Sequence, residues 1–137
     1  MRKIIGLITL LVILLTIIGG AVACKSSSPS TIDESTVRVY ADPATEMTLQ
    51  GLSENNLAKY TQYGNPEFKA AVTQEILDEA AAQIGGPLGA YESKEFLSIE
   101  EQGDYILVHY EAKYEKGEVG IRMVFDKDHL VAGQWFE

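Results

Sequence analysis

Cysteine is almost missing from this sequence, because Cys24 is the only one among 137 residues. One cysteine cannot form an intramolecular disulfide, so the folded part must depend on burial of apolar side chains. With only two histidines as well, we expect no transition-metal site. The sequence also lacks the G-x-S-x-G, H-E-x-x-H, P-loop and G-x-G-x-x-G motifs. We therefore expect no cofactor and no metal, and we assign no catalytic residue.

Acidic residues are missing from residues 1–23, and all twenty Asp and Glu follow Cys24. Residues 24–137 hold nine Lys and Arg against those twenty acids, which gives a net charge of −11. Phosphate backbones repel so acidic a chain, so we expect no nucleic acid as a partner. Anionic lipid headgroups repel it too, so contact with a membrane requires a separate anchor.

The first 23 residues have the three-part pattern of a secretory signal peptide: basic Arg2 and Lys3, an apolar run over 4–18, and the small-residue stretch GGAVA. Ala21-Val22-Ala23-Cys24 resembles the lipobox of bacterial and archaeal lipoproteins, although the commonest form begins with Leu. The resemblance implies cleavage before Cys24 and a diacylglyceryl group on its thiol. Two acyl chains anchor a protein stably, at about 0.8 kcal/mol per buried CH₂.

An uncleaved transmembrane anchor is the alternative interpretation of the same residues. Residues 4–23 are long enough to span a bilayer, and Cys24 would then be an incidental thiol. The small residues before Cys24 and the polar KSSSPS after it favour the lipoprotein. Both interpretations place the rest of the chain at the cell membrane on its extracytoplasmic side.

The remaining chain divides into a tether and one domain. Residues 24–35 are rich in serine and have little to bury, which is typical of a flexible tether, and 36–137 are expected to form a single domain. Asp42-Pro43 has the N-cap and first-turn residues of a helix start, so we expect the first helix there. Ser53, Asn65-Pro66 and Thr73 predict three further helix starts, and Gly85-Gly86-Pro87 predicts the last helix end.

After Gly89 the apolar pattern alternates, as in β-strands with one buried face. Strands are expected over residues 95–101, 105–115, 118–126 and 130–137, and their short links favour a four-stranded antiparallel meander. Helices followed by strands indicate an α+β fold with the N-terminal helices packed on one face of the sheet.

The alternation assigns the two faces of this sheet. The face toward the helices is predicted to carry Ile106, Val108, Tyr110, Ala112, Tyr114, Val119, Ile121, Met123 and Phe125. The opposite face is predicted to carry His109, Glu111, Lys113, Arg122, Val124 and Trp135. Four of these are the candidate interaction residues: His109, Glu111, Arg122 and Trp135. An exposed tryptophan is costly in water, so we expect this open face to contact a partner, either a second copy in a homodimer or another protein.

Three segments resemble one family: ADPATEMTLQGL, YESKEFLSIEEQGDYILVHYEAKYEKGEVGIRMVFDKD and VAGQWF. They are similar, over about residues 38–137, to the family called domain of unknown function 3887. The resemblance implies a nuclear-transport-factor-two-like cone, in which a curved antiparallel sheet is wrapped by N-terminal helices. Members occur on lipoproteins, and the family supplies no established catalytic residues. Its members often have glycine in the last turn, where this chain has Asp128-His129.

Two functions remain open at this point. Tyr60, Tyr110 and Tyr114 are candidates to line a pocket in the mouth of the cone, but ordinary core positions explain them better. His109 and Glu111 would suit acid–base catalysis, but paired surface side chains on one strand explain them better. A non-enzymatic binding module with an unknown ligand is therefore favoured over a small lyase, isomerase or hydrolase-like enzyme. A polar pocket inside the cone would favour the enzyme.

Overall fold

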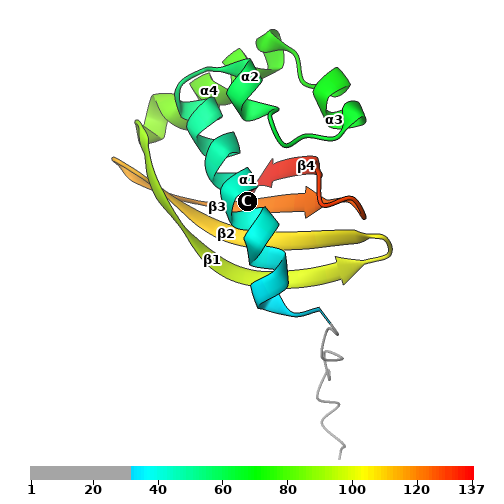
Figure 1. Ribbon diagram of the computed structural model, residues 1–137. Helices are drawn as coiled ribbons and strands as arrows, with labels where there is room; N and C mark the ends of the chain where they lie inside the picture. Colours follow the sequence, from blue (N-terminus) through cyan, green and yellow to red (C-terminus); the bar gives the residue numbers. More distant parts are fainter. Residues whose placement is uncertain (1–31) are drawn as a thin grey trace, which may run out of the picture.

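The computed structural model describes residues 32–137, in which helices are followed by one antiparallel sheet (Figure 1). The helices are α1 (Glu34–Ser53), α2 (Leu57–Tyr60), α3 (Pro66–Ala71) and α4 (Gln74–Leu88). The strands are β1 (Tyr91–Gln102), β2 (Tyr105–Tyr114), β3 (Gly117–Phe125) and β4 (Val131–Phe136). The predicted α+β class is confirmed. The signal peptide and Cys24 lie outside the described residues.

The four strands pair in chain order, β1-β2-β3-β4, so the predicted antiparallel meander is confirmed and β1 and β4 are the edges. The sheet is curved, and α1 lies across its concave face (Figure 1). β1 begins at Tyr91, four residues before the expected start, and its pairing with β2 shifts register at Glu92 and at Leu97. Such bulges bend an edge strand and increase its twist.

The first helix does not begin at Asp42-Pro43, and this prediction is wrong. α1 begins at Glu34, and the side chain of Asp33 caps it by accepting a hydrogen bond from Ser35 N. Glu34 and Ser35, which we assigned to the tether, therefore lie in its first turn. Pro43 costs the helix one backbone hydrogen bond, but residues on either side of it, such as Ala41 and Ala44, are buried against the sheet. This packing outweighs the local preference for a break.

The last helix also continues beyond its predicted end. Gly85-Gly86-Pro87 lies inside α4, which ends at Leu88 and is capped by Gly89 at a φ of 82°. The carbonyl of Leu88 accepts a hydrogen bond from Lys116 N at 2.9 Å, and this contact with the β2–β3 turn holds the final turn in place. Gly85 and Gly86 stay helical, and Gly89 takes the positive φ that glycine adopts without strain.

The short helices follow asparagine caps. Asn65 caps α3, as predicted, and Thr73 caps α4, as predicted. The cap of α2 is Asn56 rather than Ser53, which is the last residue of α1. Gly51 lies where α1 meets α2, because a side chain there would collide with the backbone of Tyr60. Glycine at position 51 therefore allows the two helices to approach closely.

The core lies between α1 and the concave face of the sheet. The two predicted apolar rows point into it, and Val108, Tyr110, Ala112, Ile121, Met123 and Phe125 are fully buried there. Val37, Ala41, Ala44, Leu49 and Leu52 of α1 fill the space opposite these rows. No helix among residues 32–137 has the length and apolarity needed to cross a membrane.

Candidate functional site

The three candidate pocket tyrosines lie on the helix side of the sheet. Tyr110 is fully buried, and its hydroxyl donates a 2.8 Å hydrogen bond to Asp42 Oδ1. Burial, together with this bond to Asp42, raises the pKa of Tyr110. Tyr60 donates to Gln134 Oε1 at 2.7 Å, and burial raises its pKa to about 12. Both hydroxyls are thus neutral and already have acceptors.

Tyr114 differs from the other two tyrosines, because its hydroxyl is buried and has no hydrogen-bond partner among the described residues. Burial raises its pKa to about 12, so it also stays protonated. Its ring packs edge-on against Tyr91 at 5.7 Å, whereas the ring of Tyr110 meets Phe96 at 5.9 Å. The two cavities described below have other linings. A pocket that unites the three tyrosines stays a prediction.

A polar cluster joins α1 to β1, and the sequence analysis did not identify it. Arg38 Nε lies 3.1 Å from Asp42 Oδ2, and the Arg38 guanidinium lies 4.8 Å above the ring of Phe96. Further along the helix, Tyr91 donates to Glu46 Oε2 at 2.8 Å. Burial and this bond to Glu46 raise the pKa of Tyr91. In the sequence, the sign of this cluster is that Arg38, Asp42 and Glu46 are four residues apart, which places their charges on one face of a helix. The cluster fastens the helix to the edge strand.

The open face carries a line of side chains that crosses all four strands. Ser98 pairs with His109, His109 with Arg122, and Arg122 with Trp135. The Arg122 guanidinium lies 5.3 Å above the indole of Trp135, which is 48% exposed. The structure therefore brings three of the four predicted interaction residues into contact range across neighbouring strands.

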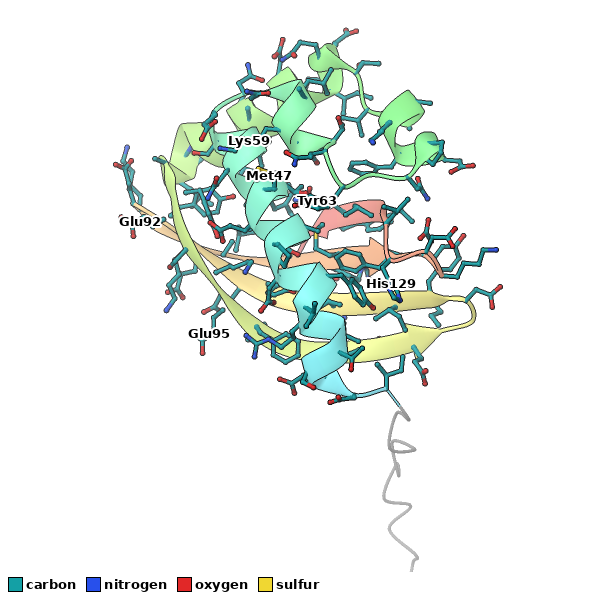
Figure 2. All side chains as sticks on the ribbon, in the orientation of Figure 1. Met47, Lys59, Tyr63, Glu92, Glu95 and His129 are labelled. Carbon is teal, nitrogen blue, oxygen red and sulfur yellow. The ribbon has the colours of Figure 1, made fainter. Side chains whose placement is uncertain are left out.

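Glu111, the fourth predicted residue, lies one step further along the same face. It pairs with Glu95 on β1 and with Gly120 on β3, and Figure 2 shows Glu95 pointing away from the helices. Two carboxylates opposite one another repel. Lys113 Nζ relieves part of this repulsion, because it lies 3.7 Å from Glu95 Oε2.

Glu137 belongs to this face as well, although the sequence analysis did not select it. Its carboxylate lies 3.2 Å from Arg122 Nη1 and 3.4 Å from His109 Nδ1. On the other side of the ring, Glu100 Oε1 lies 3.9 Å from His109 Nε2. The alternation that placed Trp135 outward also applies to Glu137, two residues later, so the pattern contained this information.

An apolar band lies beside this line of polar residues. Leu107 is only 8% exposed although it lies outside the core cluster, and it pairs with Val124, which pairs with Gly133. The Trp135 indole lies directly over Gly133, so a side chain at this position would displace the indole. Leu97, at the bulge of β1, is 54% exposed. We call these residues, Leu97, Leu107, Val124 and Trp135, the outer band.

The outer band and its charged neighbours combine apolar and ionic side chains on one surface. No three His, Cys, Asp or Glu side chains within residues 32–137 are grouped so that they could hold a metal ion. The open face is a half-polar sheet surface with a bare aromatic ring, which is the usual composition of a protein contact.

Two cavities lie at the end of the sheet that carries the β3–β4 turn. One, of about 280 Å³, lies between the start of α1 and the β3–β4 turn. The other, of about 570 Å³, lies between α3 and the same turn and is lined by acidic and apolar residues.

Comparison with known proteins now places the chain in a family. The model of a family described as "Protein of unknown function (DUF3887)" matches residues 46–133. The chain belongs to this family. The match extends from the second half of α1 to Gly133 in β4, so it includes both the core and the open face.

A solved structure supports the fold. An NMR structure of a protein from Ruminococcus gnavus ATCC 29149 is similar at a TM-score of 0.55 and 18% identity. The similarity covers 78% of this chain and 93% of that one. At this identity it shows a shared fold alone. No curated protein matches the chain.

Proposed function

We propose that this protein is a lipid-anchored extracytoplasmic module that acts by binding and not by catalysis, and that the open face of its sheet holds a protein partner. The observation that carries the proposal is the exposed indole of Trp135, which belongs to the outer band and also stands in one line with Arg122 and His109. Aromatic residues and arginine dominate the binding energy of many interfaces.

The anchor rests on Ala21-Val22-Ala23-Cys24 and on the short segment that follows it. Seven residues separate Cys24 from Ile32, and seven extended residues reach at most about 25 Å. The domain would therefore stay close to the bilayer. Confinement near one surface raises the effective concentration of one copy for another, so a second copy is the simplest partner.

The enzyme alternative has less support. A cone-type active site needs ionisable groups that face an accessible pocket. Tyr110 is buried with its hydroxyl on Asp42, and α1 side chains fill the concave face around it. The relationship to the nuclear-transport-factor-two-like cone remains part of this proposal. A curved sheet with helices on its concave side supports it (Figure 1).

Association of the full chain tests the proposal. Trp135→Glu places a charge in the outer band, and Val39→Glu is the matched control because Val39 is 77% exposed on α1. We expect sedimentation equilibrium in density-matched detergent to show a wild-type dimer, a dissociation constant at least about tenfold higher for Trp135→Glu, and no change for Val39→Glu.

Thermal unfolding of the same samples gives the second measurement. Trp135 is half-exposed, so Trp135→Glu should change stability by no more than about 1 kcal/mol, most of it from the lost contact with Arg122. A wild-type chain that stays monomeric rejects a second copy as the partner. If the wild type is monomeric and Trp135→Glu also strongly lowers its melting temperature, the indole has a purely structural role.

A further inference from the structure

The cavity of about 280 Å³ at the start of α1 is independent of the open face. Its lining comes from the first turns of α1, from the β1–β2 turn and from the β3–β4 turn. Figure 2 shows His129 of the β3–β4 turn beside α1. Three segments that are far apart in the sequence thus meet around one hollow.

The inner surface of this cavity is apolar and aromatic. Val37 is buried, Ile106 is partly buried, and both pack in the core cluster. The ring of Tyr40 stacks flat on His129, with 4.2 Å between the ring centres and 1° between the planes. Tyr40 also meets Phe125 edge-on at 5.3 Å. The stacked pair of Tyr40 and His129, supported from the core by Phe125, forms an aromatic wall of the cavity, and a ligand can meet only the edges and outer faces of this pair.

His129 is held rigidly in this wall. Its φ is 63°, a left-handed conformation that few residues other than glycine adopt. Its N–H donates to Asp126 O at 3.0 Å, and Asp126 Oδ1 accepts from the N–H groups of Asp128 and Leu130. A rigid wall lowers the entropy cost of binding a flat ligand.

Charge at the rim favours a cation. Asp104 and Asp126 line the cavity, and Lys127 is the one lysine or arginine in its lining, which also contains His129. Burial acts to raise the pKa of Asp126, but hydrogen bonds from Asn65, Leu130 and Asp128 outweigh it and lower the pKa. Asp126 is therefore ionised at neutral pH. Because its oxygens accept hydrogen bonds from Asn65 and from the backbone of the turn, Asp126 acts through its charge, and Asp104 is the direct partner for a ligand.

We propose that this cavity binds a small aromatic amine, with its ring against the wall of Tyr40 and His129 and its ammonium group at Asp104. The volume is at the lower end for small-molecule sites, which restricts the ligand to one or two rings. The strongly acidic chain raises the local concentration of cations and disfavours a carboxylate of the same shape.

Three probes that share an indole ring test whether the cavity prefers a positively charged ligand. Tryptamine, indole and indole-3-acetate carry a positive, a neutral and a negative group. We would measure their binding to the full chain in phosphatidylcholine nanodiscs by equilibrium dialysis at low salt, with empty discs as the blank. Tryptamine should bind about fivefold more tightly than indole-3-acetate. Added salt should reduce this difference in affinity, because it screens the charges.

Variants on α1 test the location. Thr36 lines the cavity, so Thr36→Trp should fill its mouth and abolish saturable binding of tryptamine. Val39→Trp adds the same side chain at an exposed position of the same helix that does not line the cavity, and should bind normally. Asp104→Asn should reduce the preference for tryptamine over indole-3-acetate and leave indole binding unchanged.

Several results would overturn the proposal. They are no saturable binding of any probe, equal affinity for tryptamine and indole-3-acetate, or a Thr36→Trp variant that binds tryptamine like the wild type. None of them bears on the open face, so this proposal and the binding-module proposal fail separately.

Discussion

The hydroxyl of Tyr110 donates a 2.8 Å hydrogen bond to Asp42 Oδ1, and this bond joins the centre of the sheet to the middle of α1. Arg38 binds the other oxygen of the same carboxylate at 3.1 Å. Asp42 is therefore not a helix cap, as its sequence context suggested, but the acceptor that ties the helix to the core.

Tyr110→Phe should destabilise the domain, because it removes the donor and leaves a half-buried carboxylate with Arg38 alone. A hydrogen bond to a charged group contributes about 1.5–3 kcal/mol, and we expect a loss in that range from urea unfolding. Tyr105→Phe is the control, since Tyr105 is exposed, and it should change stability by less than about 0.5 kcal/mol. Equal effects of the two variants would mean that the bond to Asp42 contributes nothing.

Because α1 begins at Glu34, substitutions at Asp33 and Pro43 should change the stability of the domain in opposite directions. Asp33 caps α1, so Asp33→Ala should lower the melting temperature by a few degrees. Pro43 is exposed within the helix, so Pro43→Ala should restore a backbone bond and stabilise the domain by about 1–2 kcal/mol. If instead the helix began at Asp42, Asp33→Ala would have no effect and Pro43→Ala would not stabilise. Thermal unfolding of both variants distinguishes the two cases.

The strands were predictable because one face of the sheet is buried. A period of two in residues such as Val108, Tyr110, Ile121 and Met123 leaves one arrangement that hides the apolar side chains, and the short turns allow only a meander. The same alternation correctly placed His109, Arg122 and Trp135 outward. Their contacts with one another depend on strand register, which the pattern of a single strand does not contain.

The helix ends were less predictable, because local preferences compete there with packing. Pro43 and Gly85-Gly86-Pro87 are strong breakers, yet both lie inside helices that the core holds. The serine-rich composition before Thr36 concealed the cap at Asp33. The extra residue at Leu97 exposes an apolar side chain where simple alternation has no place for one, so part of the outer band was missed.

The β3–β4 turn should make stability depend on pH. Hydrogen bonds hold the pKa of Asp126 below its unfolded value against the effect of burial. A lowered pKa means stability that is present above the unfolded pKa, near 4, and is lost as the pH falls through the folded value. Asp126→Asn removes this contribution, so the stability gap between wild type and variant should be largest at pH 7 and should shrink toward pH 3.

Chemical denaturation at pH 7, 5, 4 and 3 measures that gap. Asp33 and Asp78 also have lowered pKa values, but they are unchanged in both proteins and cancel in the difference. A gap that stays constant over this range would mean that the carboxylate of Asp126 is not stabilised by the turn.

The anchor at Cys24 is tested by the mass of the membrane-bound protein. If Cys24 is lipidated, the mature chain begins at this residue, lacks residues 1–23 and is heavier than its sequence by the acyl groups. Cys24→Ser removes the thiol that accepts the lipid, so the chain should keep residues 1–23 and accumulate at full length. Lys25→Ala, one residue further on, should be processed normally. Intact-mass spectrometry of the membrane fraction compares the three proteins, and a full-length wild type with a free thiol would favour the transmembrane anchor instead.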